Sequence, residues 1–242
     1  MQVAKINTSS SAVLSLNPND VIENAYLYWA GCGPGDFEVK LNGQTIIPDR
    51  TFSHQRTSNG MALEYFSTFT DITNQVQTTG NGTYTLSDLD LTPWVPYYFQ
   101  NRTNFGGWAI IVIYKNNALP LNQLNVYDGF QVIPNQILIT LNSLNVIDNQ
   151  NSKIGFLAWE GDVDIANGES LFINNNPISN PPLNPVSNAF NGTNSFTNAS
   201  NLYNMDLDVY DLENNIQIGD TSANIRMTSS QDIVMIMAFD NY

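Results

Sequence analysis

Seven consecutive residues, 108–114, read WAIIVIY, and all of them except Ala109 are β-branched or aromatic. An unbroken apolar run of this length and composition is typical of a β-strand that is buried on both faces. We therefore expect residues 108–114 to form a central strand of a β-sandwich. The run carries no catalytic machinery, so any function must lie in the loops and polar faces that such a scaffold supports.

Short strand patterns recur along the rest of the chain, and no segment of ten or more residues shows clean helical periodicity. The strongest local signal is Asn42-Gly43 between two apolar arms, because both residues tolerate the positive φ of a tight hairpin turn. Asp71 is placed to cap a short helical turn. These patterns predict an all-β protein, an antiparallel β-sandwich of the jelly-roll type.

The chain has 242 residues, and β-sandwiches of roughly 200–250 residues often form one unit. We therefore predict a single domain spanning residues 1–242, with a division into two sandwich halves as the alternative. Residues 174–201 are rich in asparagine and proline and show no strand or helix pattern. This predicts a long surface loop, with a partly ordered crossover as the alternative.

Charge limits the possible partners. The chain has 22 acidic and 8 basic residues, a net charge of −14, and 35 asparagines that supply a neutral polar surface. Nucleic acids and anionic membranes bind through clustered Lys and Arg, which are scarce here, so we expect neither as a partner. The acidic excess favours solubility, binding of divalent cations, or both. No apolar run approaches the ~20 residues of a membrane helix, so we expect no membrane insertion.

Two acidic segments are candidate calcium sites. Asp206 and Asp208 alternate with apolar residues in YNMDLDVYDL, which predicts that both carboxylates share the face of a strand opposite the core. Glu160, Asp162 and Asp164 follow a predicted strand, and Gly161 lets the chain turn so that their oxygens can converge on a hard cation. A solvated strand face and a solvated turn are the alternative interpretations, and an acid–base pair is a third for the second segment.

An aromatic cluster provides a candidate ligand site. Exposed Trp94, Tyr97 and Tyr98 would form a platform for stacking against sugars or binding a protein, whereas a loop packed over the end of the sandwich would bury them. Other chemistry is sparse. The one histidine, His54, is expected to be a surface polar residue, and Cys32, the one cysteine, a small loop or half-buried residue that can form no intrachain disulfide.

Several motifs occur together and in order: AYLYWAG at residues 25–31, GGWAIIVIYKNNALPLNQLNVYDGF at 106–130, IGFLAWEGDVDIANGESLFINN at 154–175, and SANIRMTSSQDIVMIMAF at 222–239. Together they resemble the adhesin-like domain of large, repetitive bacterial cell-surface proteins, of the gliding-motility type that Bacteroidota export through the type IX system. The resemblance implies an extracellular β-sandwich at the bacterial surface with no catalytic residues. Within it, we expect Asp128-Gly129 to shape a turn.

The sequence thus predicts a secreted, non-enzymatic adhesion module that binds a surface glycan or protein, with calcium as a candidate cofactor. Its partners would include other copies or domains of the same surface protein. Alternatives are an isolated carbohydrate-binding module and a structural subunit of a surface filament or layer. A glycoside hydrolase that uses two of Glu160, Asp162 and Asp164 is a more remote alternative.

Overall fold

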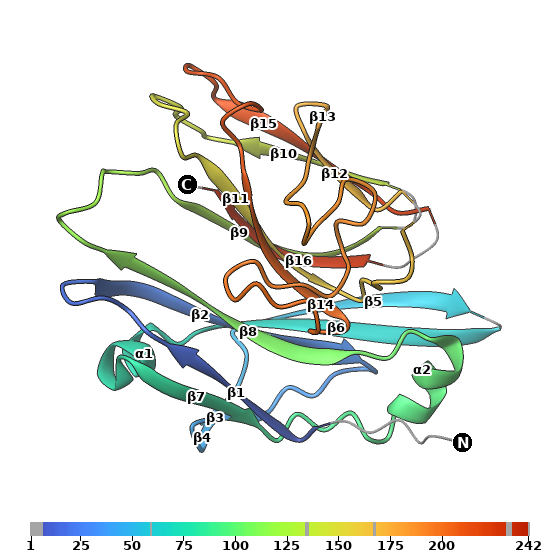
Figure 1. Cartoon of the computed structure of the whole chain (residues 1–242). Coiled ribbons are helices and arrows are strands. Elements are labelled where there is room, and N and C mark those ends of the chain that lie inside the picture. The colour runs from blue at the N-terminus through green and yellow to red at the C-terminus, as the bar shows by residue number, and fades with distance from the viewer. Residues whose placement is uncertain (1–6, 59, 134–135, 167, 231–233, 242) are drawn as a thin grey trace. The chain divides into compact units, whose positions relative to one another are not determined.

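The computed structural model describes residues 7–58, 60–133, 136–166, 168–230 and 234–241 (Figure 1). The fold is nearly all β, with 51% of residues in strands and 6% in helices, and its sheets are antiparallel. This confirms the predicted all-β sandwich. The chain divides into two compact units, Met1–Leu121 and Asn122–Tyr242, which we call unit 1 and unit 2. The single domain expected from chain length stays a prediction.

Unit 1 contains two four-stranded antiparallel sheets and two short helices. The first sheet has the order β1-β7-β3-β4, and its strands are β1 (Ser9–Leu14), β7 (Gly82–Ser87), β3 (Val39–Leu41) and β4 (Gln44–Ile46). The second has the order β5-β6-β2-β8, with β5 (Arg50–Ser58), β6 (Met61–Asp71), β2 (Val21–Cys32) and β8 (Gly106–Lys115). The helices α1 (Thr73–Thr79) and α2 (Val95–Asn101) lie at opposite ends of this unit (Figure 1).

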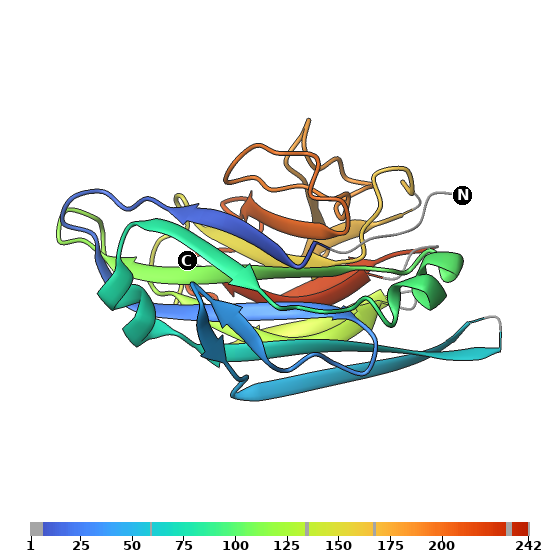
Figure 2. The same ribbon diagram turned by 90° about the horizontal axis from the view of Figure 1, so that it is seen from below.

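The local signals in the first half of the chain are largely confirmed. Asn42 and Gly43 connect β3 to β4 with φ values of 51° and 79°, as a tight hairpin requires. Asp71 accepts a hydrogen bond from the Thr73 N–H at the start of α1 (2.8 Å). The β5–β6 hairpin runs along one edge of the second sheet (Figure 2).

The prediction that residues 108–114 form a fully buried central strand is wrong. These residues belong to β8, which ends its sheet and pairs with β2 only, and among them Ala109 alone is buried. The central position belongs to β2, where residues 27–30 are all buried between β6 and β8. A continuous apolar run indicates that both faces of a strand are partly covered, but it does not specify how many neighbours the strand has.

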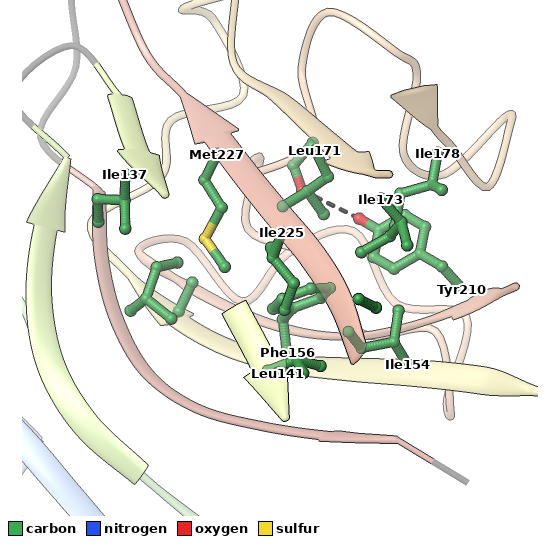
Figure 3. Close-up of a cluster of buried hydrophobic side chains, with 14 of the residues drawn as sticks. Ile137, Leu141, Ile154, Phe156, Leu171, Ile173, Ile178, Tyr210, Ile225 and Met227 are labelled. Carbon is green, nitrogen blue, oxygen red and sulfur yellow. Dashed lines mark hydrogen bonds between the residues drawn. The ribbon is translucent and has the colours of Figure 1, made fainter. Parts of the chain in front are cut away.

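Unit 2 also has two four-stranded antiparallel sheets. One has the order β10-β15-β12-β13, with β10 (Gln136–Asn142), β15 (Ser222–Thr228), β12 (Ser170–Ile173) and β13 (Asn176–Ile178). The other has the order β14-β11-β16-β9, with β14 (Met205–Asp211), β11 (Lys153–Trp159), β16 (Val234–Asn241) and β9 (Asn125–Ile133). One apolar core joins them, and Figure 3 shows Leu171 and Ile225 from the first sheet with Phe156 and Tyr210 from the second.

Two further predictions concern unit 2. Asp128 and Gly129 lie inside β9 and are half-buried, so they do not shape a turn. The predicted long loop is present, although β13 interrupts the start of the expected range, and the irregular part connects β13 to β14 over residues 179–204. This connecting segment is called the 179–204 loop below.

Candidate functional site

The 179–204 loop folds over the outer edge of β14, the end strand of its sheet. The Leu207 N–H donates to the Thr193 carbonyl oxygen (2.9 Å), and the Ser195 N–H donates to the Leu207 carbonyl oxygen (3.2 Å). The loop therefore satisfies backbone groups of β14 that the sheet leaves open, as a further strand would. This placement also brings loop side chains over one face of β14.

That face carries Asp206 and Asp208, and both side chains are buried. The predicted orientation of β14 is therefore reversed, because Met205, Leu207 and Val209 are only half-buried while the two aspartates and Tyr210 point inward. The alternation of apolar and acidic residues correctly predicts that β14 has two different faces. It did not reveal the inward face, because the cover is a polar loop rather than an apolar sheet.

The Asp206 carboxyl group is held by loop backbone. Its Oδ1 atom accepts hydrogen bonds from the N–H groups of Asn191, Gly192 and Thr193 at 2.8, 2.9 and 3.2 Å. Gly192 makes this turn possible, since it has a φ of 75° and a Cβ there would lie 2.1 Å from the Tyr203 carbonyl oxygen. The loop thus wraps three consecutive donors around one carboxylate oxygen.

Side chains of the loop hold the Asp208 carboxyl group. Its Oδ2 atom accepts from Thr193 Oγ1 at 2.7 Å and from Asn184 Nδ2 at 3.1 Å. Asn184 Nδ2 also donates to Thr193 Oγ1 at 2.6 Å, and Thr193 Oγ1 lies 2.8 Å from Asn191 Oδ1. These five residues, Asn184, Asn191, Thr193, Asp206 and Asp208, are called the Asp206 cluster below.

The Asp206 cluster contains two carboxyl groups in a poorly hydrated place. Burial, followed by the nearby Asp208 carboxyl group, raises the pKa of Asp206 to about 8, although the three backbone N–H donors oppose this rise. Burial also raises the pKa of Asp208, against the hydrogen bonds from Thr193 and Asn184. Negative charge on this pair therefore needs compensation by a proton or a cation.

Tyr210 continues the inward face of β14 into the apolar core. Its hydroxyl donates to the Ala189 carbonyl oxygen at 3.3 Å (Figure 3, dashed line), and its ring packs edge-on against Phe156. Burial raises the pKa of Tyr210 well above its usual value. Tyr210, two residues beyond Asp208 on the same face of β14, thus ties the loop to the core.

The predicted cation site at Glu160, Asp162 and Asp164 is dispersed. Glu160 is buried with a φ of 70°, Asp162 is half-buried and Asp164 is exposed. Across the described ranges, no three side chains drawn from His, Cys, Asp and Glu are close enough to hold one metal ion. Calcium therefore stays a prediction, and of the five acidic residues proposed as ligands only Asp206 and Asp208 are joined in one hydrogen-bonded cluster.

The three aromatic residues of the predicted platform do not share one face of α2. Tyr98 is buried, so it cannot contact a ligand, whereas Trp94 and Tyr97 are 37% and 58% exposed and follow each other at helical spacing i and i+3. Trp94 packs against Gly33, whose added Cβ would lie 2.7 Å from the indole. The sequence could not separate Tyr98 from its neighbours, because the helix that does so is only seven residues long.

The two remaining candidate groups, Cys32 and His54, lie on different strands of one sheet. Cys32 is buried at the end of β2 rather than in a loop. His54 lies on β5, where burial, followed by the nearby Arg56, lowers its pKa below 6.5. None of the helices in the described part of the chain is long and apolar enough to span a membrane.

The comparisons with known proteins found no relative. No family model matches the chain, and searches of curated proteins and of solved structures gave no significant match. The resemblance to bacterial surface adhesins therefore stays a prediction based on the motifs quoted above.

Proposed function

We propose that this chain is a non-enzymatic adhesion module of a bacterial cell surface, and that unit 1 binds a glycan through Trp94 and Tyr97. The observation that carries the proposal is the arrangement of these two aromatic side chains on the outward side of α2. Flat, partly exposed aromatic rings suit the apolar faces of sugar rings, and an amide-rich, weakly charged surface suits their hydroxyl groups.

The support behind α2 favours a rigid platform. The Tyr98 hydroxyl is bonded to both backbone groups of Glu64, and the Glu64 carbonyl oxygen also accepts from the Gly33 N–H at 2.8 Å. Hydrogen bonds to Glu64 of β6 therefore hold both α2 and the segment at Gly33 beneath Trp94. A platform that is fixed before binding loses less entropy when the ligand arrives.

Screening on a glycan array, followed by titration of the best ligand, tests this proposal. Trp94→Ala and Tyr97→Ala should each weaken binding at least about fivefold, since each removes a stacking surface worth roughly 1–3 kcal/mol. Phe99→Ala is the matched control, because Phe99 is exposed on the same helix at a different angle. Unchanged binding in both platform variants would argue against the site.

A surface filament or layer subunit is the second candidate, and β8 favours it. This ten-residue strand ends its sheet and contains no proline, so its outer edge offers backbone groups that can pair with another strand. Sedimentation over a wide range of protein concentrations tests the idea. A subunit should assemble as concentration rises, whereas a protein that is monomeric throughout is not one.

A further inference from the structure

We propose that the Asp206 cluster binds one calcium ion, which fastens the 179–204 loop to β14. The cluster lies in unit 2 and the proposed glycan platform in unit 1, so the ion does not depend on the proposed function. The argument rests on buried oxygen atoms that have no hydrogen-bond donor and on the charge of this unit.

Three oxygen atoms of the cluster are buried without a hydrogen-bond partner: Asp206 Oδ2, Asp208 Oδ1 and Asn184 Oδ1. Their side chains are at most 2% exposed, so bulk water does not satisfy them. The Asn184 amide oxygen is an acceptor and never a donor. The two aspartate oxygens are also acceptors only, when their carboxyl groups are ionised. Buried acceptors of this kind are normally paired with a donor or bound to a cation.

These three atoms belong to one connected group. Asn184 donates a hydrogen bond to Asp208. Thr193 Oγ1 lies 2.7 Å from Asp208 Oδ2 and 3.5 Å from Asp206 Oδ1. One oxygen of each carboxylate, Asp206 Oδ1 and Asp208 Oδ2, accepts the hydrogen bonds that hold the loop. The other oxygen of each carboxylate, together with the amide oxygen, is left for a ligand.

A fourth oxygen atom lies near Asp206 Oδ2. The point that a Cβ on Gly161 would occupy is 2.5 Å from the Phe190 carbonyl oxygen and 2.7 Å from Asp206 Oδ2. Glycine at position 161 thus leaves room beside its Cα for a backbone carbonyl oxygen and a carboxylate oxygen, where a side chain would not fit. Both are ligand types that calcium uses.

The charge of unit 2 favours a cation strongly. Residues 122–242 contain 13 acidic residues and two basic residues, Lys153 and Arg226. Lys153 pairs with Asp211, and the Arg226 guanidinium lies 3.5 Å from the centre of the Phe172 ring. Both cations thus have partners outside the cluster, so the negative charge of Asp206 and Asp208 must be compensated by a proton or by a cation from solution.

The donor set distinguishes between metals. Carboxylate, amide and carbonyl oxygens suit calcium, which accepts six to eight oxygen ligands in flexible geometry. Magnesium requires near-octahedral geometry and keeps several waters, for which a buried site has little room. The cluster offers neither the sulfur nor the imidazole ligands that zinc prefers.

Thermal unfolding and calorimetric titration of the whole chain at pH 7.5 test the proposal. Calcium at about 100 times its dissociation constant should raise the melting temperature relative to EDTA by on the order of 10 °C. Magnesium at the same concentration should raise it much less. Equal melting temperatures in calcium and EDTA would overturn the site, and an equal gain with magnesium would overturn the calcium assignment.

Variants locate the ion. Asp208→Asn and Asp206→Asn should each lose the calcium gain and reduce calcium affinity at least tenfold. Asp206→Asn should still fold in EDTA, because the neutral amide removes a buried charge and its Oδ1 atom can still accept from the N–H groups of Asn191, Gly192 and Thr193. Asp164→Asn, which changes an exposed carboxylate, is the control and should keep the full gain. The same calcium gain in all three variants would place the ion elsewhere and reject the proposal.

Discussion

Tyr98 and Glu64 exchange two hydrogen bonds: the Tyr98 hydroxyl donates to the Glu64 carbonyl oxygen at 2.6 Å and accepts from the Glu64 N–H at 2.7 Å. The pair joins α2 to β6 across 34 positions of sequence. Tyr98 also packs edge-on against Tyr65, with ring centroids 5.4 Å apart. A residue expected to contact ligand is thus the anchor that holds the platform in place.

Tyr98→Phe should lower the free energy of unfolding by about 1–3 kcal/mol, because it leaves two part-buried backbone groups of Glu64 with fewer hydrogen-bond partners. Urea denaturation measures this difference. Tyr97→Phe is the matched control and should be neutral within about 0.5 kcal/mol, since Tyr97 is largely exposed. Similar losses in both variants would contradict the anchoring role of Tyr98.

Gly161→Ala should destabilise unit 2 by about 1–3 kcal/mol, because the new methyl group would lie within 2.7 Å of backbone and carboxylate atoms that have little room to move. Gly129→Ala is the control, since a Cβ at position 129 meets no atom within 4 Å. Thermal unfolding of both variants makes the comparison. A tolerated Gly161→Ala would show that the Phe190 carbonyl and Asp206 can separate at small cost.

Thr193→Val should release the 179–204 loop from β14. The substitution keeps the shape of the side chain but removes the hydroxyl that donates to Asp208 and accepts from Asn184, which should cost about 1–3 kcal/mol. Hydrogen exchange should speed up at the N–H groups of Asn191 to Thr193, while exchange in the strands of unit 1 stays unchanged. Thr197→Val, at an exposed position of the same loop, should leave exchange as in the parent protein.

His54 should titrate below its usual pKa of 6.5, since burial and Arg56 both disfavour the charged ring. The folded protein then binds this proton less readily than the unfolded chain. Stability from this group is complete above pH 6.5 and declines as the pH falls towards the folded pKa. As His54 is the only histidine, NMR of its ring protons gives the value directly. His54→Gln should remove this part of the pH dependence.

The sequence was most informative where structure depends on neighbouring residues. Asn42-Gly43 predicted its hairpin because the turn geometry is set by those two residues alone. The inward face of β14 depends instead on Asn184 and Thr193, which lie 24 and 15 positions away from Asp208. Hydrophobic periodicity assigns polar residues to solvent, so a strand covered by a polar loop is assigned the wrong way round.

The position of β8 shows the same limit at the level of the sheet. Its apolar residues identified a strand correctly, but the number of neighbours depends on which other strands pair with it. The candidate site was predictable only in part for this reason. Asp206 and Asp208 were identified from their spacing, while Asn184, Asn191 and Thr193 were hidden among many similar residues in a segment rich in asparagine.

The 179–204 loop separates its residues into two sets. Asn184, Asn191 and Thr193 point inward and fix the backbone, whereas Phe196 and Tyr203 are 68% and 81% exposed. Residues of the outer set can therefore be exchanged without disturbing the hydrogen bonds that define the loop. Such a segment presents exchangeable side chains on a constant base, so its outer surface can change while the framework beneath it is kept.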